Sequence, residues 1–385
     1  MSSFACRAAA ASSLVLLAGL RAATAAPDKA SLRHEYRQLV DRYRTGDTGA
    51  VVQLTAWPSS DLEVAADGLD CVHVAVCEAA AVLHLEAAVL QLTTGYWDSA
   101  GGQVAAGRMI LRNLLLPRGP ACAACQQDAP APELTGRFAF SWHLAAGYLA
   151  QSRGFHAPAY SSYLDAQHLR PEDPEATLAL ATAVEAIVLP DGFGGVFIDA
   201  ATIQGIVGEV SPAETRAGSS GLLDERQSPY RLRLLGHLQA QYRHVLAADP
   251  VLHEARLRLG RVLAASGQRE AARVELRAVL AESRDPFDAA LAHLCLARLA
   301  EAPEEAATSY RSAAEADPSL REAWLGLSET CWRMEDRPAA RAALRRALAD
   351  ENDATLSAWV QYHLGRGRAF KPALAALRRL VLGRR

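Results

Sequence analysis

The feature that most constrains the fold of this chain is a repeat in its C-terminal half, whose copies follow one another at a constant period of 34 in the numbering. A small or apolar residue begins each copy, a larger apolar one follows four positions later, and a small or β-branched one comes three further on. These positions are Leu238, Ala272, Ala306 and Ala340; Tyr242, Leu276, Tyr310 and Leu344; and Val245, Val279, Ala313 and Ala347. Offsets of four and three lie on one face of a helix. A unit repeated at a fixed period buries that face against neighbouring copies, so the pattern predicts a stacked helical array suited to binding.

An earlier segment follows the same template. Ala159, Tyr163, Ala166 and Pro171 have the offsets of Ala306, Tyr310, Ala313 and Pro318. Proline cannot continue a helix, so the prolines mark unit boundaries. The interval between Pro171 and Pro250 equals one period plus 45. We therefore expect residues 174–187 and 229–246 to be the two helices of one unit, separated by a Gly- and Pro-containing insertion at 188–228.

The repeated residues resemble the tetratricopeptide repeat family, whose template is W-x2-L-G-x2-Y, then A-x3-F, then P. Trp324 and Leu327 match its opening with Ser328 in place of glycine, and Leu259 and Gly260 match it in an earlier unit. Asp-Pro pairs recur at unit boundaries, the second displaced by two residues from strict register (Asp249-Pro250, Asp285-Pro286, Asp317-Pro318). The resemblance is strongest over 238–352. It implies an all-α fold, a right-handed α-solenoid of antiparallel helix pairs, with a concave groove that binds a peptide, a helix or another subunit.

The expected organisation has seven parts. They are a signal peptide at 1–25, divergent helical hairpins at 26–116, a Cys/Pro loop at 117–137, a repeat with the start of the interrupted unit at 138–187, the insertion at 188–228, the array at 229–352, and basic capping helices at 353–385. Within 26–116 we expect helices near 31–43, 50–57, 70–92 and 98–116.

The N-terminus has the pattern of a secretory signal. Arg7 precedes an apolar stretch from Ala8 to Leu20, which is too short to span a bilayer. Ala23-Thr24-Ala25 supplies small residues for cleavage near Ala25. We therefore expect an exported protein, in the periplasm, at the cell surface or secreted, of the bacterial type that the composition also favours. A cytosolic chain with an Ala-rich start is the alternative.

The groove implied by the resemblance would be lined by first helices of the repeats. Residues turned off their packed faces are the candidates to contact a protein or peptide partner. They are Tyr148, Gln151, Glu254, Arg261, Glu322, Glu329, Trp332 and Arg333. Aromatic and Arg side chains are the types that anchor interfaces, while solvated helix surface is the competing interpretation.

Cys122 and Cys125 form the sharpest local motif. In an oxidising compartment they predict a disulfide, within the loop or to Cys71 or Cys77. A redox motif would accompany a strand–helix–strand pattern, and a structural zinc site would need a second well-spaced pair. Neither is present, so we expect no metal, no cofactor and no catalytic residue. The alternative is a disulfide- or metal-dependent enzyme built on this loop.

Charge excludes one partner class and leaves another open. The formal net charge of −3 gives no reason to expect nucleic acid. After Asp353 the chain has basic but no acidic residues, and Leu374, Leu377, Val381 and Leu382 form an apolar helical face. We expect a helix that caps the last repeat; peripheral contact with an anionic membrane is the alternative. The sequence thus favours a non-enzymatic protein-interaction scaffold of the cell envelope, and leaves its oligomeric state open.

Overall fold

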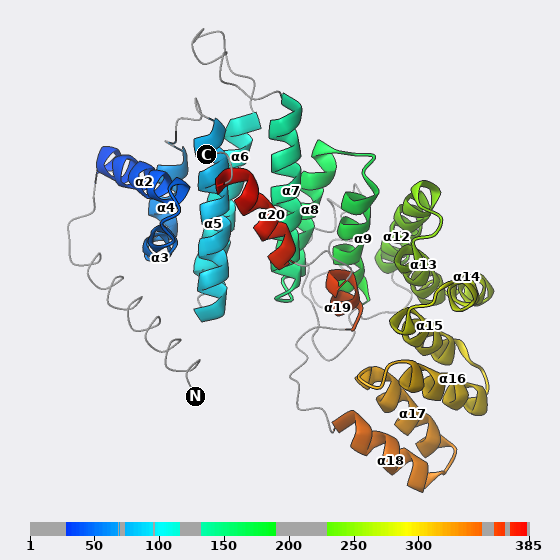
Figure 1. Ribbon diagram of the computed structural model, residues 1–385. Coiled ribbons are helices and arrows are strands. Elements are labelled where there is room, and N and C mark those ends of the chain that lie inside the picture. Colours follow the sequence, from blue (N-terminus) through cyan, green and yellow to red (C-terminus); the bar gives the residue numbers. More distant parts are fainter. Residues whose placement is uncertain are drawn as a thin grey trace. The chain divides into compact units, whose positions relative to one another are not determined.

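The computed structural model describes residues 28–67, 69, 74–94, 97–115, 132–189, 229–348, 358–365 and 370–382. Over these ranges the chain forms seventeen helices and no strand (Figure 1). The expected all-α class is therefore confirmed. The expected signal peptide, Cys122 and Cys125, and the expected insertion beyond residue 189 lie outside the described residues. The chain divides into two compact units, which are described separately.

The first unit is built around one long apolar helix, α5. It contains α2 (Lys29–Arg44), α3 (Gly49–Thr55), α4 (Ser59–Asp67), α5 (Val74–Thr94), α6 (Trp97–Leu115), the larger part of α7 (Pro132–Gln151), and α20 (Phe370–Leu382). Helices α2, α3, α6 and α20 all pack against α5. The sequence pattern predicted four helices before residue 117; α4 is an additional one that starts just after Trp57-Pro58.

Helix α5 combines an apolar composition with polar residues held inside the fold. Val74–Leu92 is the only helix among the described residues that is long and apolar enough to cross a membrane, and 78% of it is buried. Its Gln91 donates to the Thr55 carbonyl at 2.9 Å, and its His84 Nδ1 pairs with Gln103 Oε1 at 2.6 Å. Internal partners for polar groups are typical of a core helix.

The buried imidazole of His84 makes the first unit sensitive to acid. Burial lowers the pKa of His84 to about 4, although the Gln103 hydrogen bond acts in the opposite direction. The unfolded chain, with a pKa near 6.5, therefore binds one more proton than the native state between about pH 6.5 and 4. We expect the free energy of unfolding to fall through this window as the pH is lowered, by about 3 kcal/mol in total. Urea denaturation across pH 4–7 measures the slope.

The matched variants for this prediction are His84→Gln and His34→Gln. His34 is exposed on α2. The slope should flatten in His84→Gln and persist in His34→Gln, whatever the absolute stability of either protein. Identical slopes in both variants would show that His84 is not the group responsible.

The second unit contains the repeat array. It holds most of α8 (His156–Leu169) and all of α9 (Pro174–Val188), α12 (Pro229–Ala248), α13 (His253–Ala265), α14 (Arg269–Glu282), α15 (Pro286–Leu299), α16 (Pro303–Ala316), α17 (Arg321–Arg333), α18 (Arg337–Leu348) and α19 (Ala358–Gly365). From α12 to α18 each helix packs on the next (Figure 1). Helix α9 also packs on α12. The prediction that these two helices pair across the insertion is therefore confirmed.

The repeat period of the sequence corresponds to a burial pattern. Of the twelve repeat positions, nine are buried; Ala306 and Tyr310 are partly buried, and Leu344 is 42% exposed. Where the first and second helices of a pair meet most closely, a Cβ on Gly260 would lie 2.9 Å from Leu276. At the equivalent position Ser328 replaces glycine, and its hydroxyl donates to the Ala340 carbonyl at 2.9 Å. That hydrogen bond explains how serine is tolerated at this contact.

The turns inside three helix pairs share one backbone conformation. Gly154, Gly267 and Glu335 occupy equivalent repeat positions, and all have positive φ, at 77°, 81° and 62°. In each turn the residue after the one with positive φ donates its backbone N–H to the carbonyl five residues before it. Asp336, for example, donates to Cys331 at 3.0 Å. This arrangement favours glycine, because a side chain is strained at positive φ.

Glu335→Gly is therefore expected to stabilise the protein by about 0.5–1 kcal/mol, through relief of strain at this turn. Thermal unfolding by calorimetry measures the gain. The control is Glu329→Gly, at an exposed position within α17, which should destabilise by about 1 kcal/mol because glycine is a poor helix former. A loss of stability in both variants would mean that position 335 carries no strain.

The middle pair departs from the template for an identifiable reason. After Pro250 and Pro318, the helix begins three residues later, and the preceding aspartate accepts backbone N–H groups within the turn. Asp285 instead caps α15 directly, accepting from Phe287 N–H at 2.8 Å, with Pro286 as the first helical residue. The Asp285-Pro286 pair is thus displaced by two residues because it forms the start of the helix itself, whereas the other two pairs lie in the turn before the helix. Helix α15 therefore begins at Pro286 itself.

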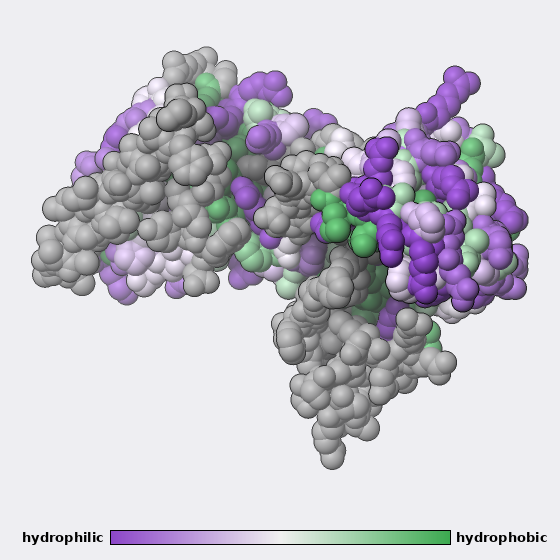
Figure 2. All heavy atoms as spheres, turned by 90° about the horizontal axis from the view of Figure 1, so that it is seen from below, coloured by the Kyte–Doolittle hydropathy of each residue, from purple (hydrophilic) through white to green (hydrophobic). Residues whose placement is uncertain are grey.

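The sequence led us to expect that the C-terminal helices cap the last repeat. They pack elsewhere. Helix α19 packs on α9 in the second unit, and α20 packs on α5 in the first. Leu377 of α20 is buried and Arg378 pairs with Glu86 at 2.6 Å. The apolar face of α20 is therefore used inside the fold. The last helix pair keeps exposed apolar side chains (Leu325, Trp332, Met334, Leu344, Leu348). In the space-filling view, apolar residues show as separate patches on a mainly hydrophilic surface (Figure 2).

Candidate functional site

The candidate site is the set of helix faces on which α19 lies. Three consecutive first helices contribute to it: α9, α13 and α15. On α13, Glu254, Arg258 and Arg261 follow one another at intervals of four and three residues, which places them on one helix face. All three are buried. We call the faces of α9, α13 and α15 that contact α19 the α19-binding face.

A charged network joins α9 to α13 at the centre of this face. Glu185 of α9 is fully buried and pairs with Arg258 at 3.2 Å and with Arg261. Arg258 Nε donates to Glu254 Oε1 at 3.0 Å. The hydroxyl of Tyr242 donates to the other oxygen of Glu185. Two guanidinium groups and two carboxylates thus compensate one another where water is excluded. We call these five residues the Glu185 network.

Electrostatics inside the network shift the pKa values of Tyr242 and Arg258 upward. Burial raises the pKa of Tyr242 well above its ordinary value, and the neighbouring Glu185 carboxylate raises it further. Burial alone would lower the pKa of Arg258, but Glu185 and Glu254 raise it more, so the net shift is upward. These upward shifts favour a neutral hydroxyl donor at Tyr242 and a cation at Arg258.

Helix α19 covers this network with three side chains of one helical face. The Trp359 ring lies 4.6 Å from the guanidinium carbon of Arg261, and its backbone carbonyl accepts from Arg258 Nη2 at 2.6 Å. His363 Nδ1 donates to Glu254 Oε1 at 2.9 Å. The hydroxyl of Tyr362 donates to the buried Asp288 of α15. The contacts join residues 74 to 109 positions apart in sequence.

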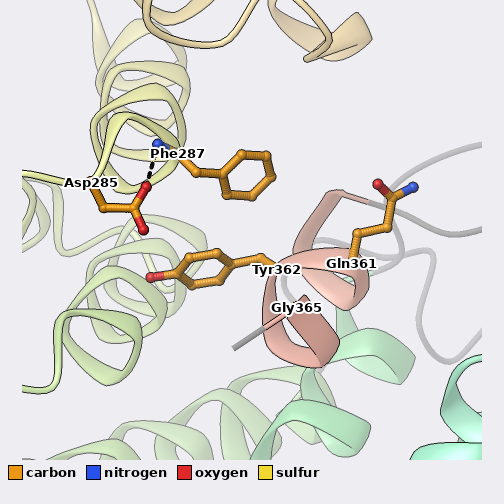
Figure 3. Close-up of a pocket in the computed structure, with 5 residues that line it drawn as sticks. All are labelled: Asp285, Phe287, Gln361, Tyr362 and Gly365. Carbon is orange, nitrogen blue, oxygen red and sulfur yellow. Dashed lines mark hydrogen bonds between the residues drawn. The ribbon is translucent and has the colours of Figure 1, made fainter. Parts of the chain in front are cut away.

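A cavity of about 340 Å³ continues the site at the start of α15. It is lined by Asp285, Phe287, Gln361, Tyr362 and Gly365. The Phe287 and Tyr362 rings are stacked, with centroids 5.5 Å apart and planes 22° apart. Figure 3 shows the Tyr362 ring reaching from α19 toward α15, with the Asp285 carboxylate turned to the Phe287 N–H. The α19 contact is therefore aromatic at one end and ionic at its centre.

The eight residues expected to line an open groove fall into two groups. Tyr148, Gln151, Glu254 and Arg261 are buried. Gln151 accepts from the Tyr163 hydroxyl at 2.8 Å, and Glu254 and Arg261 belong to the Glu185 network beneath α19. Glu322 is partly buried; Glu329 and Arg333 form an exposed ion pair. Trp332 is 55% exposed, with the Arg337 guanidinium 3.5 Å from its ring centroid.

Sequence reasoning did not find the residues at the centre of the site. Glu185, Arg258, Trp359, Tyr362 and His363 were not among the candidates. The available signal was Arg258 itself, because it lies between Glu254 and Arg261 on the same helix face. For α19, the signal was the spacing of Trp359, Tyr362 and His363, which places one large aromatic and two hydrogen-bonding side chains on the same helix face.

The cysteine and metal expectations are only partly covered by the described residues. Cys122 and Cys125 lie outside them. Cys77 is disulfide-bonded, whereas Cys295 and Cys331 are buried cysteines outside any disulfide. Within the described ranges, no group of three or more His, Cys, Asp or Glu side chains is arranged to hold a metal ion.

Comparison with known protein families and with curated proteins gives no match for this chain. The resemblance to tetratricopeptide repeats therefore depends on the repeated residues alone.

Proposed function

We propose that this chain is a non-enzymatic interaction scaffold of the tetratricopeptide repeat type, exported to the cell envelope. In this proposal the helix pairs are antiparallel, the array coils as a right-handed superhelix, and the first helices line a groove that receives a helical segment of a protein partner. The supporting observation is the α19-binding face: three first helices already hold a short helix through aromatic, ionic and hydrogen-bonding contacts. A helix held on a groove by such anchors is a recurring mode of peptide recognition.

The interaction role is tested by photo-crosslinking in the native cell. A photoreactive phenylalanine analogue replaces Trp332, which is exposed on the first helix α17, or Val274, which is 65% exposed on the second helix α14. We expect a discrete crosslinked product from position 332 and none from position 274. Crosslinks at neither position, or equal crosslinks at both, would contradict a partner in the groove.

Export is tested separately by determining the N-terminus of the mature protein. We expect a chain that begins near Ala26, in the envelope or extracellular fraction. An intact chain that retains the apolar stretch and stays in the cytosol would contradict the proposed location.

A further inference from the structure

We infer that α19 is a displaceable occupant of the groove, and that the partner competing with it is a short helix with an aromatic residue followed three and four positions later by a hydroxyl donor and a cationic or imidazole donor. This inference rests on the proposed function and specifies both its ligand class and its regulation.

Helix α19 is arranged as a ligand would be. It has eight residues, lies outside the repeat series, and contacts first helices of three units. Each of its three anchors meets a complementary group: Trp359 the guanidinium groups, Tyr362 the Asp288 carboxylate, and His363 the Glu254 carboxylate. The side chains at positions 359, 362 and 363 share one helix face, as in other helices that bind in a groove.

The face beneath α19 does not depend on α19 for its internal pairing. Arg258 is held by Glu185 and Glu254, and Arg261 by Glu185, all within α9 and α13. When α19 leaves, these ion pairs stay in place and their charges regain water, which offsets part of the lost contact energy because burying charge is unfavourable. The uncovered face therefore keeps the arrangement of charged groups that a second helix would bind.

The charge of this face specifies what the second helix carries. Three carboxylates, from Glu185, Glu254 and Asp288, face two guanidinium groups, from Arg258 and Arg261, and Asp285 lines the adjacent cavity, so carboxylates are in excess. An acidic segment is disfavoured there. A partner with an aromatic ring over the arginines and N–H or O–H donors toward Glu254 and Asp288 satisfies every group that α19 satisfies.

The test is peptide binding by the full mature chain. The probe is a fluorescein-labelled synthetic peptide with the sequence of residues 356–367, followed by fluorescence anisotropy. In the wild type, α19 competes with the peptide. The double variant Trp359→Ala, Tyr362→Ala weakens α19 and should bind the peptide at least about 10-fold more tightly, because apparent affinity scales with the fraction of open groove. Arg277→Ala, at an exposed position of α14 outside the site, should bind as the wild type does.

One further variant and one further measurement complete the test. Adding Arg261→Ala to the double variant should abolish the gain, because it removes the cation under the aromatic ring. Equally weak binding by the wild type and the folded double variant would overturn the inference. If the double variant does not fold, hydrogen exchange of the wild type decides: α19 amides should exchange at least about 100-fold faster than those of α13, since opening is local. Equal exchange would overturn it.

The source of the competing helix is read from the same samples. Sedimentation that shows the wild type forming dimers through exchange of α19 would assign the groove to a second copy and overturn the partner assignment. Peptide exchange is measured on purified protein, so its failure leaves the cellular crosslinks at position 332 unaffected. Conversely, if the peptide binds as expected but no crosslinks form at position 332, only the proposed scaffold role is contradicted.

Discussion

Arg258→Met lowers the free energy of unfolding of the second unit by about 3–5 kcal/mol, as expected when one member of a buried ion network is removed. Arg258 is 2% exposed, and it is the residue that joins Glu185, Glu254 and the Trp359 carbonyl. Methionine fills much of its volume but leaves two carboxylates facing each other without a cation between them. Urea denaturation followed by circular dichroism measures the loss.

The matched control is Arg277→Met. Arg277 is exposed on α14, so its replacement should change stability by less than about 0.5 kcal/mol. Equal, small effects of the two substitutions would show that Arg258 is solvated and that the Glu185 network does not exist as described.

Trp142→Ala is expected to cost the first unit about 3–5 kcal/mol, the range for removing a large aromatic side chain from a core. Trp142 lies on α7 and is fully buried. Its indole N–H donates to the Ala81 carbonyl of α5 at 2.8 Å, and its ring fills the space beside Gly107 of α6. Calorimetric unfolding measures the loss, and exposed Trp332→Ala is the control, with an expected effect below about 1 kcal/mol.

The partner glycine allows a sharper form of this prediction. A Cβ on Gly107 would lie 2.5 Å from Trp142 Cζ2, so Gly107→Ala alone should destabilise. In the Trp142→Ala background the space is vacant, and the same change should stabilise by up to about 1 kcal/mol through helix propensity. If Gly107→Ala has the same sign in both backgrounds, the two residues are not in contact.

The helices of the array could be predicted from the sequence because their cause is local. A constant repeat period with offsets of four and three specifies a helix face, and the prolines and the glycine of the turns specify where helices stop. The pairing of α9 with α12 also followed from the period. The extra helix α4 and the start of α15 at Pro286 could not be predicted from the period. Proline at positions 58 and 286 is compatible both with a break between helices and with the start of a helix.

The candidate site could be predicted only in part, because its cause is not local. Glu254 and Arg261 were expected on an open groove, but both are buried in the Glu185 network beneath α19. Whether such charges are solvated or buried depends on residues far away along the chain, and no periodicity connects Trp359 or Tyr362 to the array. The same holds for α20: an apolar face is visible in the sequence, but not that α5 is its partner.

The most direct test of the account is a double-mutant cycle between Phe287 of α15 and Tyr362 of α19. The cycle uses Phe287→Leu, Tyr362→Leu and the double variant, each unfolded by urea in the full mature chain. Stacked rings at 5.5 Å predict a coupling energy of about 0.5–1.5 kcal/mol. A coupling energy of zero, with all variants folded, would show that α19 does not lie on the first helices, and would contradict the site and both proposals built on it.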